Sequence, residues 1–281
     1  MSGTLLFGPL SVDRYVDEGI DLPGGGVLNM AYHWAHGEVP FRLLSRIGDD
    51  QVELFRSFLD RHGIATLPSL VAPGVSSSID IVMRDDRQPW MDHFVEGVWA
   101  DVRWTDDDRL ELRQAERVHA VLVDAVAQAI DELGADGVLD APLVSGDFLS
   151  FRHYSVERFA QTMQWLDLGF IGWPGAPDHP TIGGVRDVAF DQGTLVVVTM
   201  GADGVLLLDG RPEQRRERFV PVQAVAVDGT TVGCGDAFIA AFLATWWQSD
   251  DLDAAVQAGM AAGAAATRWM RPLPDAAFAL G

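Results

Sequence analysis

The sequence predicts an α/β protein in which helices cover both faces of a mostly parallel sheet and a small β lid accompanies that sheet. Two observations predict this fold class. Short apolar runs, typical of buried parallel strands, alternate with helical segments along most of the 281 residues. Two β-type segments near residues 75–95 break the alternation and indicate a hairpin. With 48% apolar residues, the chain can bury a large core, and we expect a single domain over residues 1–281.

The expected elements follow from local pattern. Residues 4–10 are an apolar strand that ends at Gly8 and Pro9, residues 26–36 a helix entered through glycines, and residues 41–47 a second strand. Residues 50–62 place Val52, Phe55, Phe58 and Leu59 on one helical face, and Gly63 ends that helix. Further strands are expected at 118–123, 137–139, 168–171 and 195–200, and further helices at 126–133, 156–166, 182–190, 233–247 and 252–269.

The expected hairpin consists of residues 75–83 and 90–95, which flank a polar turn at 84–89. Residues 15–22 can add a strand to it. We therefore expect a lid formed by residues 13–22 and 75–98, separate from the main sheet.

The composition excludes several classes of chemistry. All twenty cationic side chains are arginine, and a chain without lysine has neither the lysine of a Walker-A loop or protein kinase nor a Schiff-base amine. The net charge of −21 argues against nucleic acid or an anionic membrane as a partner. The single cysteine, Cys234, cannot form an internal disulfide, and the N-terminal residues lack the pattern of a signal peptide. A cytoplasmic location is therefore expected, with no membrane-spanning segment.

A glycine-rich turn before a late helix is the sharpest local signal. Gly233 and Gly235 allow the backbone to pass close to a ligand, and the first turn of the following helix presents unpaired N–H groups to an anion. Asp236 lies in that same turn. Beside a phosphoryl group, a carboxylate is useful as the base that takes a proton from an attacking hydroxyl. Taken alone, the same residues also fit a tight turn with an aspartate at a helix N-terminus.

Other motifs accompany this turn in a fixed order. Asp13 is followed by Gly24-Gly25-Gly26-Val27-Leu28-Asn29, then by Gly48-Asp49-Asp50, then by Thr199-Met200-Gly201-Ala202-Asp203-Gly204, and finally by Gly233-Cys234-Gly235-Asp236. In this order the set resembles the ribokinase-like (PfkB) carbohydrate kinases across essentially the whole chain. The resemblance implies a three-layer sandwich with a mostly parallel central sheet and a small β lid. It also implies ATP and Mg²⁺ as cofactors.

The resemblance assigns roles to individual positions. It implies that Asp236 is the catalytic base and that the backbone N–H groups of Gly233, Cys234 and Gly235 hold the transferring phosphoryl group. It assigns sugar binding to Asp13, Gly24, Gly25 and Asn29, and places the nucleotide along Thr199, Gly201 and Gly204, with the Ala-rich helix as an adenine wall. It implies that Asp49 and Asp50 shape a turn and cap the following helix. Independently, Asp124 follows an expected strand, at the edge where ligands bind in open parallel sheets, which makes it a further substrate-contact candidate.

The chain also departs from the family pattern. The N-x-x-E motif that organises Mg²⁺ in most relatives is absent from residues 170–178, where Asp178 is the remaining candidate, so the metal ligands stay unknown. Thr230 replaces an aspartate that helps to build a monovalent-cation site in several relatives. Glu53 stands where a glycine is usual.

One branch of the family, the fructosamine kinases that phosphorylate fructoselysine at its 6-hydroxyl, is similar to this chain at residues 94–101, 118–120 and 170–174. The resemblance implies a kinase acting on a primary hydroxyl of a ketose or ketose-amine. Two alternatives stay open: a kinase for another acceptor, such as fructose or a nucleoside clamped by Trp90 or Trp99, and a sugar-binding regulator without turnover. A Rossmann dehydrogenase is excluded because the first strand does not lead into G-x-G-x-x-G. A homodimer through the lid is expected, since an exposed lid strand favours being covered.

Overall fold

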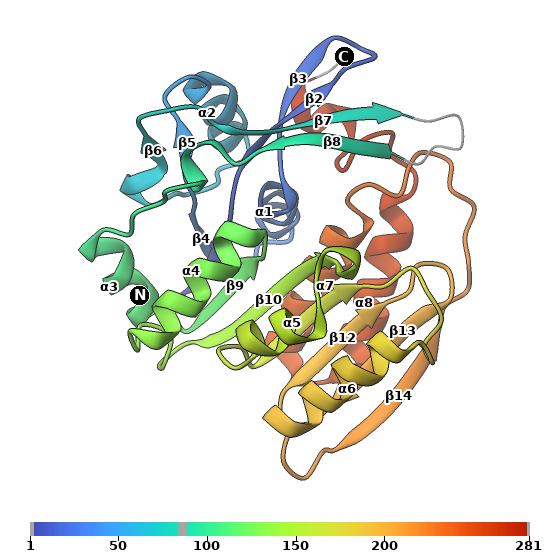
Figure 1. The fold of residues 1–281 in the computed structure, drawn as a ribbon. Helices are drawn as coiled ribbons and strands as arrows, with labels where there is room; N and C mark the ends of the chain where they lie inside the picture. Colours follow the sequence, from blue (N-terminus) through green and yellow to red (C-terminus); the bar gives the residue numbers. More distant parts are fainter. Residues whose placement is uncertain (1–2, 84–88, 280–281) are drawn as a thin grey trace. The chain divides into compact units, whose positions relative to one another are not determined.

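The computed structural model describes residues 3–83 and 89–279, and the chain divides into two compact units (Figure 1). Unit 1 comprises Met1–Thr4 and Arg109–Val225, and unit 2 comprises Leu5–Asp108 and Ala226–Gly281. Most of the expected hairpin turn at residues 84–89 lies outside the described residues. Among the described residues, no helix is long and apolar enough to cross a membrane.

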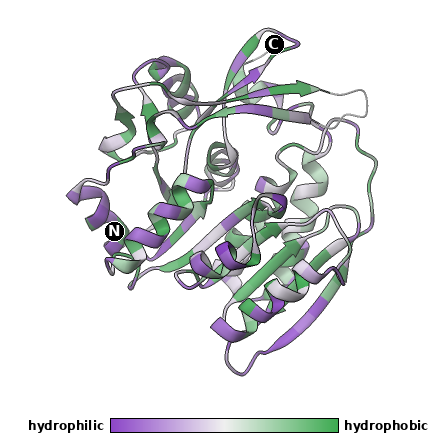
Figure 2. Ribbon diagram, in the orientation of Figure 1, coloured by the Kyte–Doolittle hydropathy of each residue, from purple (hydrophilic) through white to green (hydrophobic). Residues whose placement is uncertain are grey.

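Unit 1 is built on a sheet whose strands run in the order β14-β13-β12-β11-β10-β9. The strands from β9 to β12 pair in parallel, and β13 and β14 continue the sheet in antiparallel fashion. The strands are β9 (Arg117–Val121), β10 (Leu143–Ser150), β11 (Leu168–Gly172), β12 (Leu195–Thr199), β13 (Gly204–Asp209) and β14 (Arg216–Pro221). Figure 2 shows a contrast in hydropathy: β12 and β13 are apolar, whereas the edge strand β14 is largely hydrophilic. The side chains of β13 and most of those of β12 are buried.

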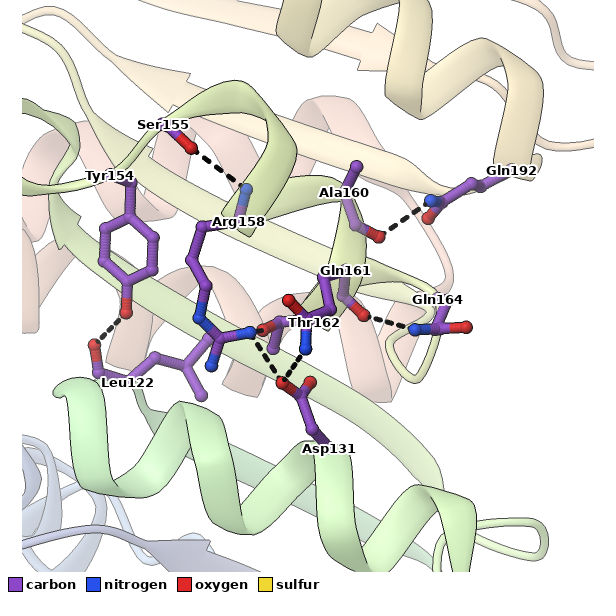
Figure 3. A network of polar contacts seen from close by, with 10 residues as sticks. All are labelled: Leu122, Asp131, Tyr154, Ser155, Arg158, Ala160, Gln161, Thr162, Gln164 and Gln192. Atoms are coloured by element: carbon purple, nitrogen blue, oxygen red, sulfur yellow. Dashed lines mark hydrogen bonds and ion pairs between the residues drawn. The ribbon is translucent and has the colours of Figure 1, made fainter.

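The helices of unit 1 connect these strands and pack beside them. They are α4 (Asp124–Ala135), α5 (Val156–Met163) and α6 (Pro180–Gln192), with a short η3 turn (Phe151–His153); α3 (Asp106–Gln114) begins at the end of unit 2 and continues into unit 1. The packing of α5 on α4 is fixed by polar contacts (Figure 3). Arg158 Nη1 donates to Asp131 Oδ2 at 2.6 Å and to Thr162 Oγ1 at 2.8 Å, and the Tyr154 hydroxyl donates to Leu122 O at 2.7 Å.

The prediction of a strand at residues 137–139 is wrong. These residues close the C-terminal end of α4: Val138 N donates to Leu133 O at 2.9 Å, and Gly137 adopts a left-handed φ of 67°. The short apolar run therefore covers a helix end, and the strand lies at β10 instead. That strand is hard to predict because Ser145, Gly146 and Asp147 interrupt its apolar pattern.

Unit 2 contains the remaining helices. They are α1 (Gly26–His36), α2 (Val52–Arg61), α7 (Cys234–Ser249) and α8 (Leu252–Ala266), with short 3₁₀ turns η1 (Pro68–Leu70), η2 (Gly97–Trp99) and η4 (Asp275–Phe278). Helix α7 contacts both α1 and α8: Trp34 Nε1 of α1 donates to Ala240 O at 3.0 Å, and α8 packs closely along α7. A Cβ at Gly259 of α8 would lie 2.8 Å from the Phe238 ring, so the small residues of α8 have a packing reason of their own.

The strands of unit 2 form three groups. Strands β1 (Thr4–Phe7) and β4 (Phe41–Leu44) are neighbours, and β5 (Ile47–Gly48) pairs with β6 (Val71–Ala72). A separate four-stranded sheet has the order β3-β2-β7-β8. Its members are β2 (Ser11–Tyr15), β3 (Ile20–Gly24), β7 (Ser77–Met83) and β8 (Pro89–Val95). This sheet is mixed, with β2 parallel to β7 and the other pairs antiparallel, which confirms the expected accessory sheet and its hairpin.

Candidate active site

The glycine-rich turn leads directly into α7, as the sequence predicts. Gly233 stands at the N-cap in a left-handed conformation with φ 76°, and a Cβ there would lie 2.7 Å from Pro272, so glycine is required by the fold itself. Gly235 differs, because a Cβ at that position would meet nothing within 4 Å. No packing demand explains the glycine at 235, and the space beside it is available to a ligand at the N-terminus of the helix.

Asp236 occupies the first turn of α7 and is held by α1. Asn29 Nδ2 donates to Asp236 Oδ2 at 2.7 Å, which joins two residues that are 207 positions apart in the chain. The other polar side-chain atom of Asn29, Oδ1, is buried without a hydrogen-bond partner among the described residues. Because an orphaned buried acceptor is costly, this oxygen fits a donor supplied by a ligand, such as a sugar hydroxyl.

Asp13 lies on β2 and is 6% exposed. Ser11 Oγ donates to Asp13 Oδ1 at 2.8 Å, and the Asp13 carboxylate lies over Gly24, where a Cβ would be 2.1 Å from it. Gly25 has φ 95°, and its own Cβ would lie 2.8 Å from Pro9 O. The two glycines therefore leave room for the Asp13 carboxylate and for a sharp entry into α1.

The two aspartates influence each other electrostatically. Burial raises the pKa of Asp13 to about 7, the hydrogen bond from Ser11 opposes that rise, and the charge of Asp236 adds to it. Burial also raises the pKa of Asp236 above its usual range, while the Asn29 hydrogen bond opposes the rise. The site in unit 2 thus holds two carboxyl groups with a heightened affinity for protons.

Cys234 and Thr230 have structural partners. Burial, together with the charge of Asp236, raises the pKa of the Cys234 thiol to about 11, so the thiol stays protonated at neutral pH. Its backbone N–H makes a long bond of 3.4 Å to Thr231 O. Thr230 is fully buried, and its hydroxyl accepts from Val232 N at 2.8 Å, which holds the loop before the turn.

The remaining candidates lie in unit 1. Thr199 ends β12, and Gly201 adopts φ 56° in open surroundings, where an added Cβ would meet no atom within 4 Å, whereas Gly204 is required by the approach of Val220 O in β14. Asp124 is exposed at the first position of α4. The structure therefore brings Asp13, Gly24, Gly25, Asn29 and the Gly233–Asp236 turn together within unit 2, whereas Thr199, Gly201 and Gly204 lie at β12 and β13 of unit 1 and Asp124 lies apart from them, after β9.

The metal candidate has no supporting cluster. Asp178 is exposed in a compact turn where Trp173 Nε1 donates to Ala176 O at 3.1 Å. Among residues 3–83 and 89–279, no group of three or more His, Cys, Asp or Glu side chains is placed to hold a metal ion. A Mg²⁺ ion carried by nucleotide phosphates needs only one or two protein ligands, and the described residues are compatible with that arrangement.

The expected helix-capping role of Asp49 and Asp50 is wrong. Gln51 is the N-cap of α2, and no side chain caps the helix there. Both aspartates accept hydrogen bonds from the segment at Gly74–Ser76 instead. A short polar residue before a helix usually indicates an N-cap in a sequence. Here the carboxylate oxygens of Asp49 and Asp50 accept from Gly74 and Ser76, which lie about 25 residues further along the chain, and not from the amides of α2. The sequence analysis missed Ser11, although its position two residues before Asp13 on β2 places both side chains on the same face of the strand and could have indicated the contact.

Comparisons with known proteins agree with this geometry. The family model for pfkB family carbohydrate kinases matches residues 172–270. The chain is 27% identical over 254 residues to fructoselysine 6-kinase of Escherichia coli, covering 90% of this chain and 92% of that protein. It is 28% identical over 231 residues to acarbose 7(IV)-phosphotransferase of an Actinoplanes species, covering 78% and 71%. Among solved structures, Arabidopsis thaliana ribokinase complexed with ribose and ATP superposes with a TM-score of 0.77 at 19% identity, covering 98% and 96% of the two chains.

Proposed function

Since the chain belongs to the pfkB family of carbohydrate kinases, which are ATP-dependent phosphotransferases, we propose that it transfers the γ-phosphoryl group of ATP to a primary hydroxyl of a ketose or ketose-amine. The observation that carries this proposal is the contact between Asn29 and Asp236, at the N-terminus of α7. It joins a buried carboxylate, an orphaned amide oxygen and an open helix end in one site.

In the proposed reaction Asp236 is the base. Its raised pKa suits a group that must take a proton from a sugar hydroxyl, because a very acidic carboxyl is a poor proton acceptor. Asn29 holds one carboxylate oxygen, so the other accepts the proton. The hydroxyl oxygen then forms its bond to the γ-phosphorus as the bond from that phosphorus to the β-phosphate oxygen of ADP breaks.

The phosphoryl group is proposed to bind at the first turn of α7. Backbone N–H groups at Gly233, Cys234 and Gly235 and the positive end of the helix stabilise its developing charge, with the Cys234 N–H turning from its long 3.4 Å bond to Thr231 O. The absence of a side chain at 235 leaves the approach open. Along the nucleotide we propose Thr199, Gly201 and Gly204, with Asp124 as a further substrate contact. Mg²⁺, when bound with ATP, supplies charge neutralisation at the phosphates.

The acceptor is proposed to be held by Asp13 and Asn29, with Gly24 and Gly25 permitting its close approach. The site has two carboxyl groups, and no arginine of the described chain is in hydrogen-bond contact with them, which favours a neutral or cationic acceptor over a sugar phosphate. A ketose-amine carries such a positive charge, and the similarity to fructoselysine 6-kinase supports the same acceptor class. The small sheet, with residues 13–22 and 75–98, is proposed as the lid that keeps water from competing as acceptor.

The test is ATP turnover with Mg²⁺ against fructoselysine-type ketose-amines, free ketoses, acarbose, aldoses and nucleosides, run beside Asp236→Asn. We expect one acceptor class to drive ADP formation, and we expect the variant to lose at least about 10³-fold in kcat, since it has lost the base while keeping the shape of the side chain.

The result separates the proposal from its alternatives. Turnover of wild type with another acceptor would retain the kinase and change the substrate class. If wild type and Asp236→Asn were equally silent while one sugar still raised the melting temperature, the chain would be a sugar-binding regulator and the proposed reaction would be wrong.

A further inference from the structure

The segment Gly74–Ser77 is where the hairpin of β7 and β8 leaves the rest of unit 2, and we call it the hairpin root. It runs between two other parts of the chain. On one side lie Gly48, Asp49 and Asp50, which the family resemblance left without a functional role. On the other side lie Glu96, Gly97 and Val98, which follow the end of β8.

Asp50 makes the most direct polar contacts to the hairpin root. Its Oδ1 accepts from Ser76 N at 2.9 Å and from Ser76 Oγ at 2.8 Å. The same Ser76 hydroxyl accepts from Gly48 N at 3.0 Å. Ser76 is 4% exposed, so these bonds satisfy groups that would otherwise be buried without partners.

Asp49 contributes a weaker contact next to it. Its Oδ1 accepts from Gly74 N at 3.3 Å, in an exposed position, while its backbone N–H donates to Gly74 O at 3.0 Å. Removing the Asp49 side chain leaves the second of these bonds in place. Asp50 and Asp49 are therefore a matched pair for comparison by mutation. The Asp50 carboxylate binds the buried Ser76, and the Asp49 carboxylate binds the exposed Gly74.

Close backbone packing fixes the path of the root. A Cβ at Gly48 would lie 2.2 Å from Gly74 O, and a Cβ at Gly97 would lie 2.3 Å from Val75 O. Val98 N donates to Val75 O at 2.9 Å. Gly74 and Val75 also line a cavity of about 460 Å³, so the root is open on that side.

Strand pairing connects the hairpin root to the proposed acceptor site. Ser77 lies opposite Ser11 in the parallel pairing of β7 with β2, and Ile79 lies opposite Asp13. Ser11 in turn donates to the Asp13 carboxylate. A shift of the chain at Ser76 would therefore displace β7 and, through the pairing of Ser77 with Ser11, the part of β2 that orients Asp13.

We propose that Asp50 is a positioning residue that fixes the hairpin root and, through the pairing of β7 with β2, sets the place of Asp13 and of the small sheet over the acceptor. This inference rests on the proposed kinase function for its kinetic consequences, but its structural part stands without it. It gives the Gly48-Asp49-Asp50 motif a role as the anchor of the lid, in place of the helix cap that the family resemblance implies.

The experiment compares Asp50→Ala, Ser76→Ala and Asp50→Asn with the control Asp49→Ala. We expect Asp50→Ala and Ser76→Ala to raise KM for the acceptor by about tenfold or more, the effect of losing a charge-assisted hydrogen bond, with KM for ATP changed less than about twofold. Hydrolysis of ATP without acceptor should rise as well, because a displaced lid admits water. Asp50→Asn keeps an acceptor oxygen and should fall between wild type and Asp50→Ala.

Hydrogen exchange of the amides of β7 gives a readout that needs no substrate. We expect exchange over residues 77–83 to increase in Asp50→Ala and to stay at the wild-type rate in Asp49→Ala, with β12 unchanged in both. If β7 exchange and acceptor KM were unaltered in a folded Asp50→Ala protein, the inference would be overturned. If β7 exchange increased while wild type itself phosphorylated no acceptor, the anchor would stand and the proposed function would fail.

Discussion

At the scale of single residues, Asp13 and Asp236 are the groups that depart most from solution behaviour within the proposed site. Asp13 is almost fully buried, its side-chain partner Ser11 is neutral, and Asp236 adds a second negative charge nearby. Ionising it in the folded protein is therefore costlier than in the unfolded chain. A carboxyl group kept at this cost is typical of a binding or catalytic position rather than of a stabilising contact.

The pKa of Asp13 gives a prediction for stability. The ordinary value of 3.8 is raised to about 7 in the folded state, so the folded protein holds the proton more tightly than the unfolded chain. The stabilisation from this proton is complete below about pH 4 and is lost as pH rises through about 7. Asp13→Asn, which cannot ionise, should therefore unfold at a higher temperature than wild type at pH 8, and the difference should vanish near pH 4.

Thermal melts at the two pH values check this expectation. Since each pKa unit corresponds to about 1.4 kcal/mol, the gain at pH 8 is at most about 4 kcal/mol. The control is Asp124→Asn, which removes one carboxylate in the same way at an exposed position of unit 1. An Asp13→Asn protein that is less stable than wild type at pH 8 would contradict the proposed cost of ionisation.

At the scale of elements, the N-terminus of α7 separates two uses of glycine. Gly233 is required by its left-handed φ and by the proximity of Pro272, whereas nothing in the described fold requires glycine at 235. The first is a condition for forming the turn, and the second leaves space at the helix end. The sequence motif alone does not distinguish the glycine that the turn requires from the glycine that leaves space for a ligand.

Two alanine substitutions test this distinction. Gly233→Ala should lower the free energy of unfolding by about 1–3 kcal/mol, because it forces a side chain into a strained and crowded position. Gly235→Ala should leave stability unchanged or raise it by up to about 1 kcal/mol, since alanine favours helix, yet lower kcat/KM by about 10²-fold by intruding on the phosphoryl site. Chemical denaturation and steady-state kinetics measure the two effects. A fully active Gly235→Ala enzyme would remove this turn from the proposed anion site.

At the scale of the whole molecule, the small sheet presents an apolar edge. Strand β8 ends the order β3-β2-β7-β8, and four of its side chains are exposed by 43–48%: Trp90, Met91, Phe94 and Val95. A strand at the edge of a sheet that exposes apolar side chains favours pairing with another chain. With a net charge of −21 opposing nonspecific association, the proposed partner for this edge is a second copy of the same protein through the lid.

Light scattering coupled to size-exclusion chromatography tests this dimer. We expect wild type to elute with twice the mass of the chain and Phe94→Glu to elute with the mass of one chain. The matched control is Phe219→Glu, which changes a similarly exposed phenylalanine on β14, the edge strand of the other sheet. Monomeric wild type would contradict the dimer, and dissociation by Phe219→Glu alone would move the interface to β14.

Hydrophobic periodicity and short motifs are enough to predict the fold class, the order of most elements and the family, because each of these signals acts over a few neighbouring residues. Contacts between distant segments are beyond that reach. The bond of Asn29 to Asp236 and the bond of Ser76 to Asp50 join residues whose proximity depends on how the elements pack. The apolar run at 137–139 differs, because a local closure makes it a helix end: Gly137 takes a left-handed φ and Val138 N bonds back to Leu133 O, and the apolar pattern alone does not distinguish this from a short strand.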